Sequence, residues 1–191
     1  MSVRILAING SGRRDSLNRK LLDIAARGAA EAGAEVAFVR LADFGLPLYD
    51  GDLEADEGIP AGVRHLQALL AGHQGLLVAT PEYNGGYTAL LKNALDWASR
   101  PCADGSSGVA LFAGKAAALI SASPGPMGGL RSQTGMRAVL DKLGMIVVPQ
   151  SFALGAAHEA FDAEDQLKDR QAARLVGEVG ASLVRVASRL S

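Results

Sequence analysis

Short apolar runs alternate with amphipathic stretches along nearly the whole chain. The first run, at residues 3–8, ends in Asn-Gly-Ser, and apolar side chains then recur at helical spacing from Leu17 to Ala32. The run is typical of a buried parallel strand, and the 3.6-residue repeat is typical of a helix packed on a sheet. The alternation predicts five strands, at residues 3–8, 35–41, 75–80, 116–121 and 145–148. The five predicted helices lie at residues 17–32, 63–71, 88–99, 130–143 and 163–190.

One region interrupts this alternation. Residues 43–60 are rich in proline, glycine and acidic side chains, and we expect them to form a long loop. The acids at residues 50–57 are interpreted as solvated, or as lying on a partner subunit, in preference to a metal site.

Strands that alternate with helices predict an α/β fold, with a parallel sheet covered on both faces. No change of composition marks a linker and no internal repeat appears, so we expect one domain over residues 1–191. In such sheets, ligands bind beyond the carboxyl ends of the strands, where the strand order reverses. The loops that follow the strands are therefore the first place to look for a site.

Composition excludes several classes of protein. The 19 basic and 20 acidic side chains give a net charge of −1, which argues against nucleic acid as a partner. The first residues lack the features of a signal peptide, and no apolar run approaches the ~18 residues of a membrane span. We therefore expect a cytoplasmic protein with no membrane contact.

Metal and nucleophile chemistry also lack support. Cys102 is the single cysteine, so there is no disulfide framework and no thiolate metal cage. The three histidines lack a metal-ligand spacing, and no GxSxG motif of a serine hydrolase occurs. We expect no bound metal and no catalytic side chain of the protein itself.

The loop after the first strand has the features of a phosphate site. It places small hydroxyl residues and a guanidinium just before a helix begins. The N-terminus of a helix carries partial positive charge and free N–H groups, and a guanidinium fork suits phosphate oxygens. The side chains expected there are Ser11, Arg13, Ser16 and Asn18. The alternative is that Ser16 only caps the helix and the arginines are solvated.

Two common nucleotide motifs do not fit this loop. Both the Walker pattern and the dinucleotide fingerprint need glycine where Asp15 stands. The second strand ends at Arg40-Leu41 and offers no acid to hold a ribose hydroxyl. Neither ATP nor a Rossmann-type dinucleotide is the expected ligand.

The loops after the third and fourth strands suit a flat ring. Pro81 and Tyr83 offer apolar faces, Asn84 offers donors and an acceptor, and the adjacent glycines allow close backbone approach. The loop at residues 121–129 is also rich in glycine, serine and proline. Together the three loops predict a site for a mononucleotide with a planar ring.

Three segments of the chain carry a family resemblance: GSGRRDSLNRKLL from Gly10, PEYNGGYTALLKNALDWASRP from Pro81 and SPGPMGGLR from Ser123. They resemble the NADPH-dependent FMN reductases, a flavodoxin-like family that includes quinone, chromate and azo-dye reductases. The resemblance covers nearly the whole chain, and the second segment is its most specific part. It implies a flavodoxin-like doubly wound sheet in the order 2-1-3-4-5, bound FMN, and a homodimer or homotetramer. Gly12 departs from the family, since many members carry a bulkier residue there.

The resemblance also implies which residues contact the cofactor. The first loop would hold the FMN phosphate, the second would lie along the isoalloxazine and ribityl groups, and the third would reach the far side of the ring. The residues so implied are Ser11, Arg13, Ser16, Leu17 and Asn18 in the first loop, Pro81, Glu82, Tyr83, Asn84 and Gly85 in the second, and Ser123 and Gly125 in the third.

The implied activity is that of an oxidoreductase. NAD(P)H would pass a hydride to bound FMN, and an acceptor such as a quinone, flavin, chromate or azo compound would then take the same place in a ping-pong cycle. The alternative is a non-enzymatic, flavodoxin-like FMN electron carrier. Such carriers are usually strongly acidic, and a net charge of −1 does not favour that alternative.

Overall fold

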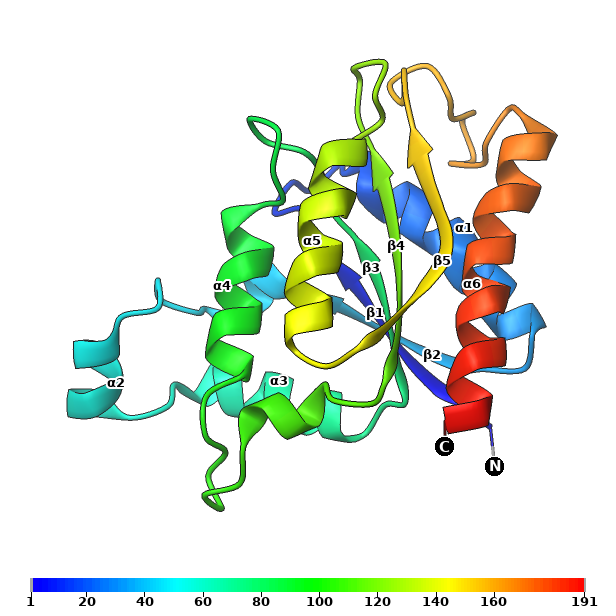
Figure 1. Cartoon of the computed structure of the whole chain (residues 1–191). Helices are drawn as coiled ribbons and strands as arrows, with labels where there is room; N and C mark the ends of the chain where they lie inside the picture. Colours follow the sequence, from blue (N-terminus) through cyan, green and yellow to red (C-terminus); the bar gives the residue numbers. More distant parts are fainter. Residues whose placement is uncertain (1, 191) are drawn as a thin grey trace.

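The computed structural model describes residues 2–190, which fold as a five-stranded parallel sheet between two layers of helices (Figure 1). Neighbouring strands all pair in parallel, in the order β2-β1-β3-β4-β5. The strands are β1 (Arg4–Asn9), β2 (Glu35–Arg40), β3 (Gly75–Ala79), β4 (Ala116–Ala122) and β5 (Ile146–Leu154). The expected flavodoxin-like strand order is confirmed.

Each face of the sheet carries its own hydrophobic core. Every residue of β3 and β4 is buried, as expected of central strands covered on both sides. In β1 the side chains alternate, so that Ile5 packs in one core and Leu6 in the other. The first core includes residues of α1 (Leu17–Glu31) and α6 (Arg170–Leu190), and the second includes residues of α3 (Ala61–Ala71), α4 (Ala89–Ala98) and α5 (Leu130–Lys142).

Helices α1 and α6 cross at very short range. A Cβ atom added at Gly180 would lie 1.9 Å from the carbonyl oxygen of Ala25, and one added at Gly28 would lie 2.1 Å from that of Gly177. Glycine is a poor helix former, and the crossing explains Gly28 in α1 and Gly180 in α6, because a side chain at either position would hold the two backbones apart. These glycines therefore allow the close approach of α1 and α6.

The expected loop at residues 43–60 is wrong, because the region contains helical structure. A 3-10 helix, η1, spans Leu41–Phe44, and the short helix α2 spans Gly51–Glu57. Asp50 caps α2, since its Oδ1 accepts a hydrogen bond from the N–H of Asp52 at 2.8 Å. No residue of α2 is buried, so an apolar repeat, the usual sign of a helix, is missing from the sequence.

The last helix begins later than expected. Residues 163–169 are not helical, and α6 begins at Arg170. The Oδ1 atom of Asp169 accepts hydrogen bonds from the N–H groups of Gln171 at 2.8 Å and Ala172 at 3.2 Å, as a residue preceding a helix does.

The fifth strand is longer than expected and continues past Pro149 to Leu154. The pairing register between β4 and β5 shifts between Ala117 and Leu119. Because β5 lies at the edge of the sheet, it tolerates a proline that would interrupt a central strand.

A matched pair of glycine variants tests the crossing of α1 and α6. Gly180→Ala should lower the free energy of unfolding by about 1–3 kcal/mol, because the new methyl group meets the backbone of α1. Gly177→Ala is the control, since its Cβ would lie 3.9 Å from the Cα of Gly28, an ordinary van der Waals contact. That variant should be neutral or stabilise by up to about 1 kcal/mol. Urea denaturation measures both, and equal stability of the two variants would contradict the packing described.

Candidate functional site

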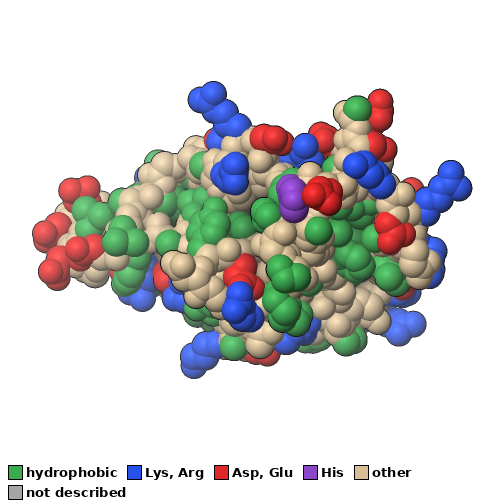
Figure 2. Space-filling model, turned by 90° about the horizontal axis from the view of Figure 1, so that it is seen from above, with side chains coloured by type: hydrophobic (Ala, Val, Ile, Leu, Met, Phe, Trp, Pro, Cys, Tyr) green, Lys and Arg blue, Asp and Glu red, His purple; other side chains and the backbone are tan. Residues whose placement is uncertain are grey.

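The loops after β1, β3 and β4 surround one cavity of about 420 Å³ at the carboxyl ends of the strands. Figure 2 looks onto the molecule from above, where these strand ends and loops lie, and shows acidic, basic and apolar side chains side by side. The cavity is lined by Ser11, Arg13, Asp15, Ser16, Leu17, Asn18, Lys20, Pro81, Glu82, Tyr83, Ala122, Ser123, Pro124 and His158. The three loops singled out in the sequence therefore do meet.

Most of the expected cofactor residues line this cavity. Those that do are Ser11, Arg13, Ser16, Leu17, Asn18, Pro81, Glu82, Tyr83 and Ser123. Three others, Asn84, Gly85 and Gly125, belong to the same loops but lie outside the lining.

The first loop ends in the capped N-terminus of α1. The Oγ atom of Ser16 accepts a hydrogen bond from the N–H of Arg19 at 3.2 Å, and the Oγ atom of Ser11 accepts one from the N–H of Arg13 at 3.3 Å. Each hydroxyl still has its own proton to donate, and the first N–H groups of a helix have no partner within it. The cap at Ser16 and a phosphate contact by the same hydroxyl are therefore compatible.

Asn18 has a different environment from the other residues of this loop. Its Nδ2 donates to the carbonyl oxygen of Ala122 at 2.8 Å, and the N–H of Ala122 donates to its Oδ1 at 2.9 Å. The side chain is buried, and both of its polar atoms bind the end of β4. Asn18 thus ties the start of α1 to the third loop.

The second loop contains a tight turn. Tyr83 and Gly86 exchange two backbone hydrogen bonds of 3.0 Å each. Between them, Asn84 and Gly85 have φ angles of +52° and +80°, as the central residues of a type I′ turn require. The Asn-Gly pair is therefore explained by the turn, which leaves the ring of Tyr83 about half exposed beside the cavity.

Glu82 connects the second loop to the start of α5. Its carboxylate accepts hydrogen bonds from the Nε of Arg131 at 2.7 Å and from the backbone N–H of Arg131 at 3.1 Å. Helix α5 follows Gly129 and has no side-chain cap of its own, so this carboxylate supplies negative charge at its positive end. The hydrogen bond from the Arg131 side chain is the main cause that lowers the pKa of Glu82.

The third loop is held in a conformation that only glycines allow. Gly128 and Gly129 both have positive φ angles, and a Cβ at Gly129 would lie 2.8 Å from the Cβ of Ser121. The hydroxyl of Ser121 donates to the carbonyl oxygen of Gly128 at 2.6 Å and accepts from the Nε2 of Gln133. This packing brings Ser123 to the cavity wall.

Sequence reasoning missed several lining residues, most importantly Lys20 and His158. Lys20 stands four positions after Ser16, and residues at this spacing share one face of a helix, so its position could have been inferred. His158 comes from a segment after β5, and no local pattern connects that segment with the first loop.

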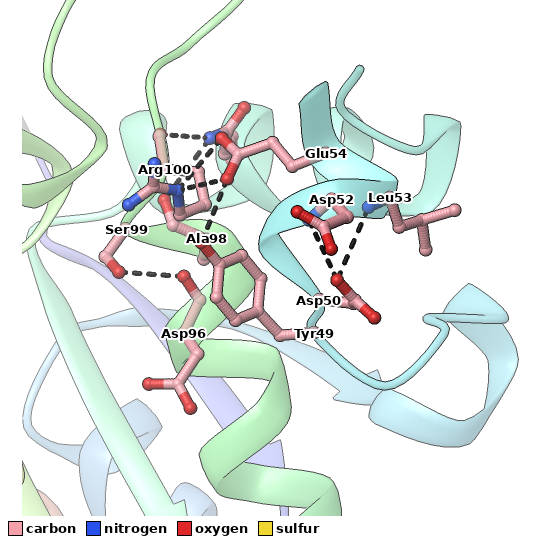
Figure 3. A network of polar contacts seen from close by, with 10 residues as sticks. Tyr49, Asp50, Asp52, Leu53, Glu54, Asp96, Ala98, Ser99 and Arg100 are labelled. Atoms are coloured by element: carbon pink, nitrogen blue, oxygen red, sulfur yellow. Dashed lines mark hydrogen bonds and ion pairs between the residues drawn. The ribbon is translucent and has the colours of Figure 1, made fainter. Parts of the chain in front are cut away.

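The acidic segment at residues 50–57 lies at one end of the molecule, where α2 projects (Figures 1 and 2). Figure 3 shows how it is attached: the carboxylate of Glu54 accepts from the hydroxyl of Tyr49 at 3.0 Å and from the Nε of Arg100 at 2.8 Å. The ring of Tyr49 meets Trp97 edge to face at 4.9 Å. Arg100 lowers the pKa of Glu54.

Residues 2–190 show neither a metal site of clustered ligands nor a membrane-spanning helix. No group of three or more His, Cys, Asp or Glu side chains in this range is arranged to hold a metal ion. Nor does any helix in it combine the length and apolar character needed to cross a membrane.

The ion pair between Glu82 and Arg131 predicts that the contribution of Glu82 to stability depends on pH. A carboxylate with a lowered pKa stabilises the fold above its unfolded pKa of about 4.5, and this contribution is lost as the pH falls through the folded pKa. Glu82→Gln should therefore lower the free energy of unfolding by about 1–2 kcal/mol at pH 7. The difference from the unaltered protein should shrink below about pH 4.

Denaturation in urea between pH 3.5 and 7.5 measures this effect. The control is Glu57→Gln, since Glu57 is an exposed residue of α2. A pH-independent difference for Glu82→Gln would contradict the assigned charge interaction.

Comparisons with known proteins identify the family of the chain. Residues 3–159 match the family described as NADPH-dependent FMN reductase. An NAD(P)H-dependent FMN reductase of Pseudomonas aeruginosa is 36% identical over 176 residues, covering 91% of this chain and 89% of that protein. An NADPH:quinone oxidoreductase of Arabidopsis thaliana is 35% identical over 195 residues, covering 98% of this chain and 93% of that protein.

A solved structure extends the likeness to three dimensions. FerB, a flavoenzyme NAD(P)H:(acceptor) oxidoreductase of Paracoccus denitrificans, superimposes with a TM-score of 0.80 at 30% identity, over 98% of both chains. Together with the cavity at the carboxyl ends of β1, β3 and β4, these matches show that the chain belongs to the NADPH-dependent FMN reductase family.

Proposed function

We propose that this cavity binds FMN, and that the chain reduces a small acceptor, such as a quinone, with electrons from NAD(P)H. One observation carries the assignment of the site: hydroxyl and guanidinium donors at the start of α1 share a single cavity with the segment from Pro81 to Tyr83. A phosphate group and a planar ring would each find suitable partners there.

The residues present fit the phosphate of this cofactor. Ser11 and Ser16 offer hydroxyl protons, Arg13 offers a guanidinium fork, and the N-terminus of α1 adds free N–H groups. Leu17 belongs to the first turn of α1, and Asn18 supports the site by fixing that turn to β4.

The ring would lie between the second and third loops. Pro81 and the aromatic ring of Tyr83 provide apolar surface, and Ser123, which directly follows β4, lines the same cavity. Glu82 positions the second loop through Arg131, while the turn at Asn84 and Gly85 shapes its far end. Gly125 contributes a backbone N–H that donates to the Oγ of Ser123 at 3.2 Å.

When bound, FMN would supply the redox chemistry, which is hydride transfer from NAD(P)H and two-electron reduction of the acceptor. The protein would bind and orient the ring and leave one face open, so that donor and acceptor use the same place in turn. No protein nucleophile takes part in this scheme. We further propose that the chain works in the cytoplasm, where NAD(P)H is available, as a homodimer or homotetramer.

A visible spectrum tests the cofactor and the donor together. After incubation with FMN and desalting, the protein should retain a flavin absorption band, and NADPH added without oxygen should bleach it. Steady-state rates with varied NADPH and quinone should then give parallel double-reciprocal lines. A retained band that NADPH does not bleach would favour the electron carrier, and a protein without flavin would contradict the proposed site.

A double variant tests the phosphate assignment. Arg13→Ala combined with Ser16→Ala should weaken FMN binding by about 1.5–3 kcal/mol for each charged hydrogen bond that is lost. Because Ser16 also caps α1, thermal unfolding of the protein without flavin must show that the variant is folded. Arg14→Ala is the matched control, since Arg14 is exposed and lies outside the cavity lining. Unchanged FMN affinity in a folded double variant would refute the assignment.

A further inference from the structure

Lys20 gives the proposed phosphate end of the cavity a second cation. It lies one helical turn after Ser16 on α1 and lines the same cavity as Ser11 and Arg13. Its side chain is only 24% exposed, and its ammonium lies 6.0 Å from the centre of the Phe161 ring. A lysine in this position is held close to the cavity wall and is not extended into solvent.

Two carboxylates face this ammonium from different parts of the chain. The Nζ atom of Lys20 lies 2.8 Å from the Oδ1 of Asp165 and 3.2 Å from that of Asp15. Hydrogen bonds to these two groups raise the pKa of Lys20. Asp15 is largely exposed, whereas Asp165 is the closer partner and the less exposed of the two.

Asp165 is presented to α1 by a defined turn. Its φ angle is +59°, and its N–H donates to the carbonyl oxygen of Asp162 at 3.2 Å. The side chain of Asp162 in turn accepts from the N–H groups of Glu164 at 3.1 Å and Gln166 at 2.7 Å. The backbone of the turn therefore fixes the position from which the Asp165 carboxylate reaches Lys20.

We propose that Lys20 binds the phosphate of FMN and that Asp165 opposes this binding, so that the pair sets the preference of the cavity for FMN over riboflavin. Lysine binds phosphate as a point charge, and a carboxylate that already pairs with the ammonium competes with the phosphate for it. Asp165 would therefore hold Lys20 at the cavity wall and also limit how tightly the phosphate binds. This inference rests on the proposed function, because it requires that the cavity takes FMN.

The test compares the affinities for FMN and riboflavin, measured by quenching of flavin fluorescence at constant ionic strength. Riboflavin lacks only the phosphate, so the ratio of the two affinities isolates the phosphate contact. Lys20→Met should weaken FMN binding about tenfold and change riboflavin binding less than about twofold. Lys20→Arg keeps the charge and should restore most of the FMN affinity.

Asp165→Asn provides the opposite change. It removes the carboxylate charge at a position whose left-handed backbone asparagine readily adopts. FMN affinity should rise about threefold while riboflavin affinity stays constant. In the double variant with Lys20→Met this gain in FMN affinity should disappear, because Asp165 acts on the phosphate only through the ammonium of Lys20.

The control for a general charge effect is Arg19→Met. Arg19 is the neighbouring cation of α1, but it pairs with Asp23 at 2.8 Å and does not line the cavity. In this variant, the ratio of the FMN affinity to the riboflavin affinity should stay within about twofold of the ratio for the unaltered protein.

The outcomes distinguish this inference from the proposed function. If the unaltered protein binds no FMN, the proposed function fails. If it binds FMN but Lys20→Met leaves the FMN-to-riboflavin ratio unchanged, or Asp165→Asn lowers FMN affinity, the inference about Lys20 is overturned and the FMN site stands.

Discussion

Parallel pairing of the central strands is the constraint on which the site depends. Asn9 lies opposite Ala79, and Ala79 lies opposite Ile120, so β1, β3 and β4 end at nearly the same level. The chain continues this pairing for one more step, since the N–H of Gly10 donates to the carbonyl oxygen of Ala79 and that of Thr80 to Ile120. Three loops that are far apart in the sequence begin together for this reason.

Side chains then fasten these loops to one another. Asn18 joins the first loop to the third, and Glu82 joins the second to α5. Thr88 caps α4 and donates its hydroxyl proton to the carbonyl oxygen of Gly10 at 2.8 Å, which joins the second loop to the first. Many side chains of the sequence motifs therefore maintain the geometry of the cavity. Fewer of them, such as Arg13, are free to contact a ligand.

The sequence predicts the fold well where burial leaves a pattern. The strands and the larger helices follow from apolar runs and repeats, whereas α2 does not, because none of its residues is buried. The site was predicted to a similar extent. Its three loops follow from their place after the strands, and Lys20 follows from its helical spacing with Ser16. His158 and the contact between Lys20 and Asp165 instead depend on the chain beyond β5. Those contacts exist only once α6 and its preceding turn pack against α1.

The projecting helix α2 has a consequence for how the chain can diverge among related proteins. It rests on the core through a few contacts around Tyr49, Glu54 and Arg100, and none of its residues is buried within the chain. Substitutions there would have little effect on stability, which for most residues limits what selection accepts. Relatives can therefore vary the length, charge and surface of this segment while the sheet and its cavity stay unchanged.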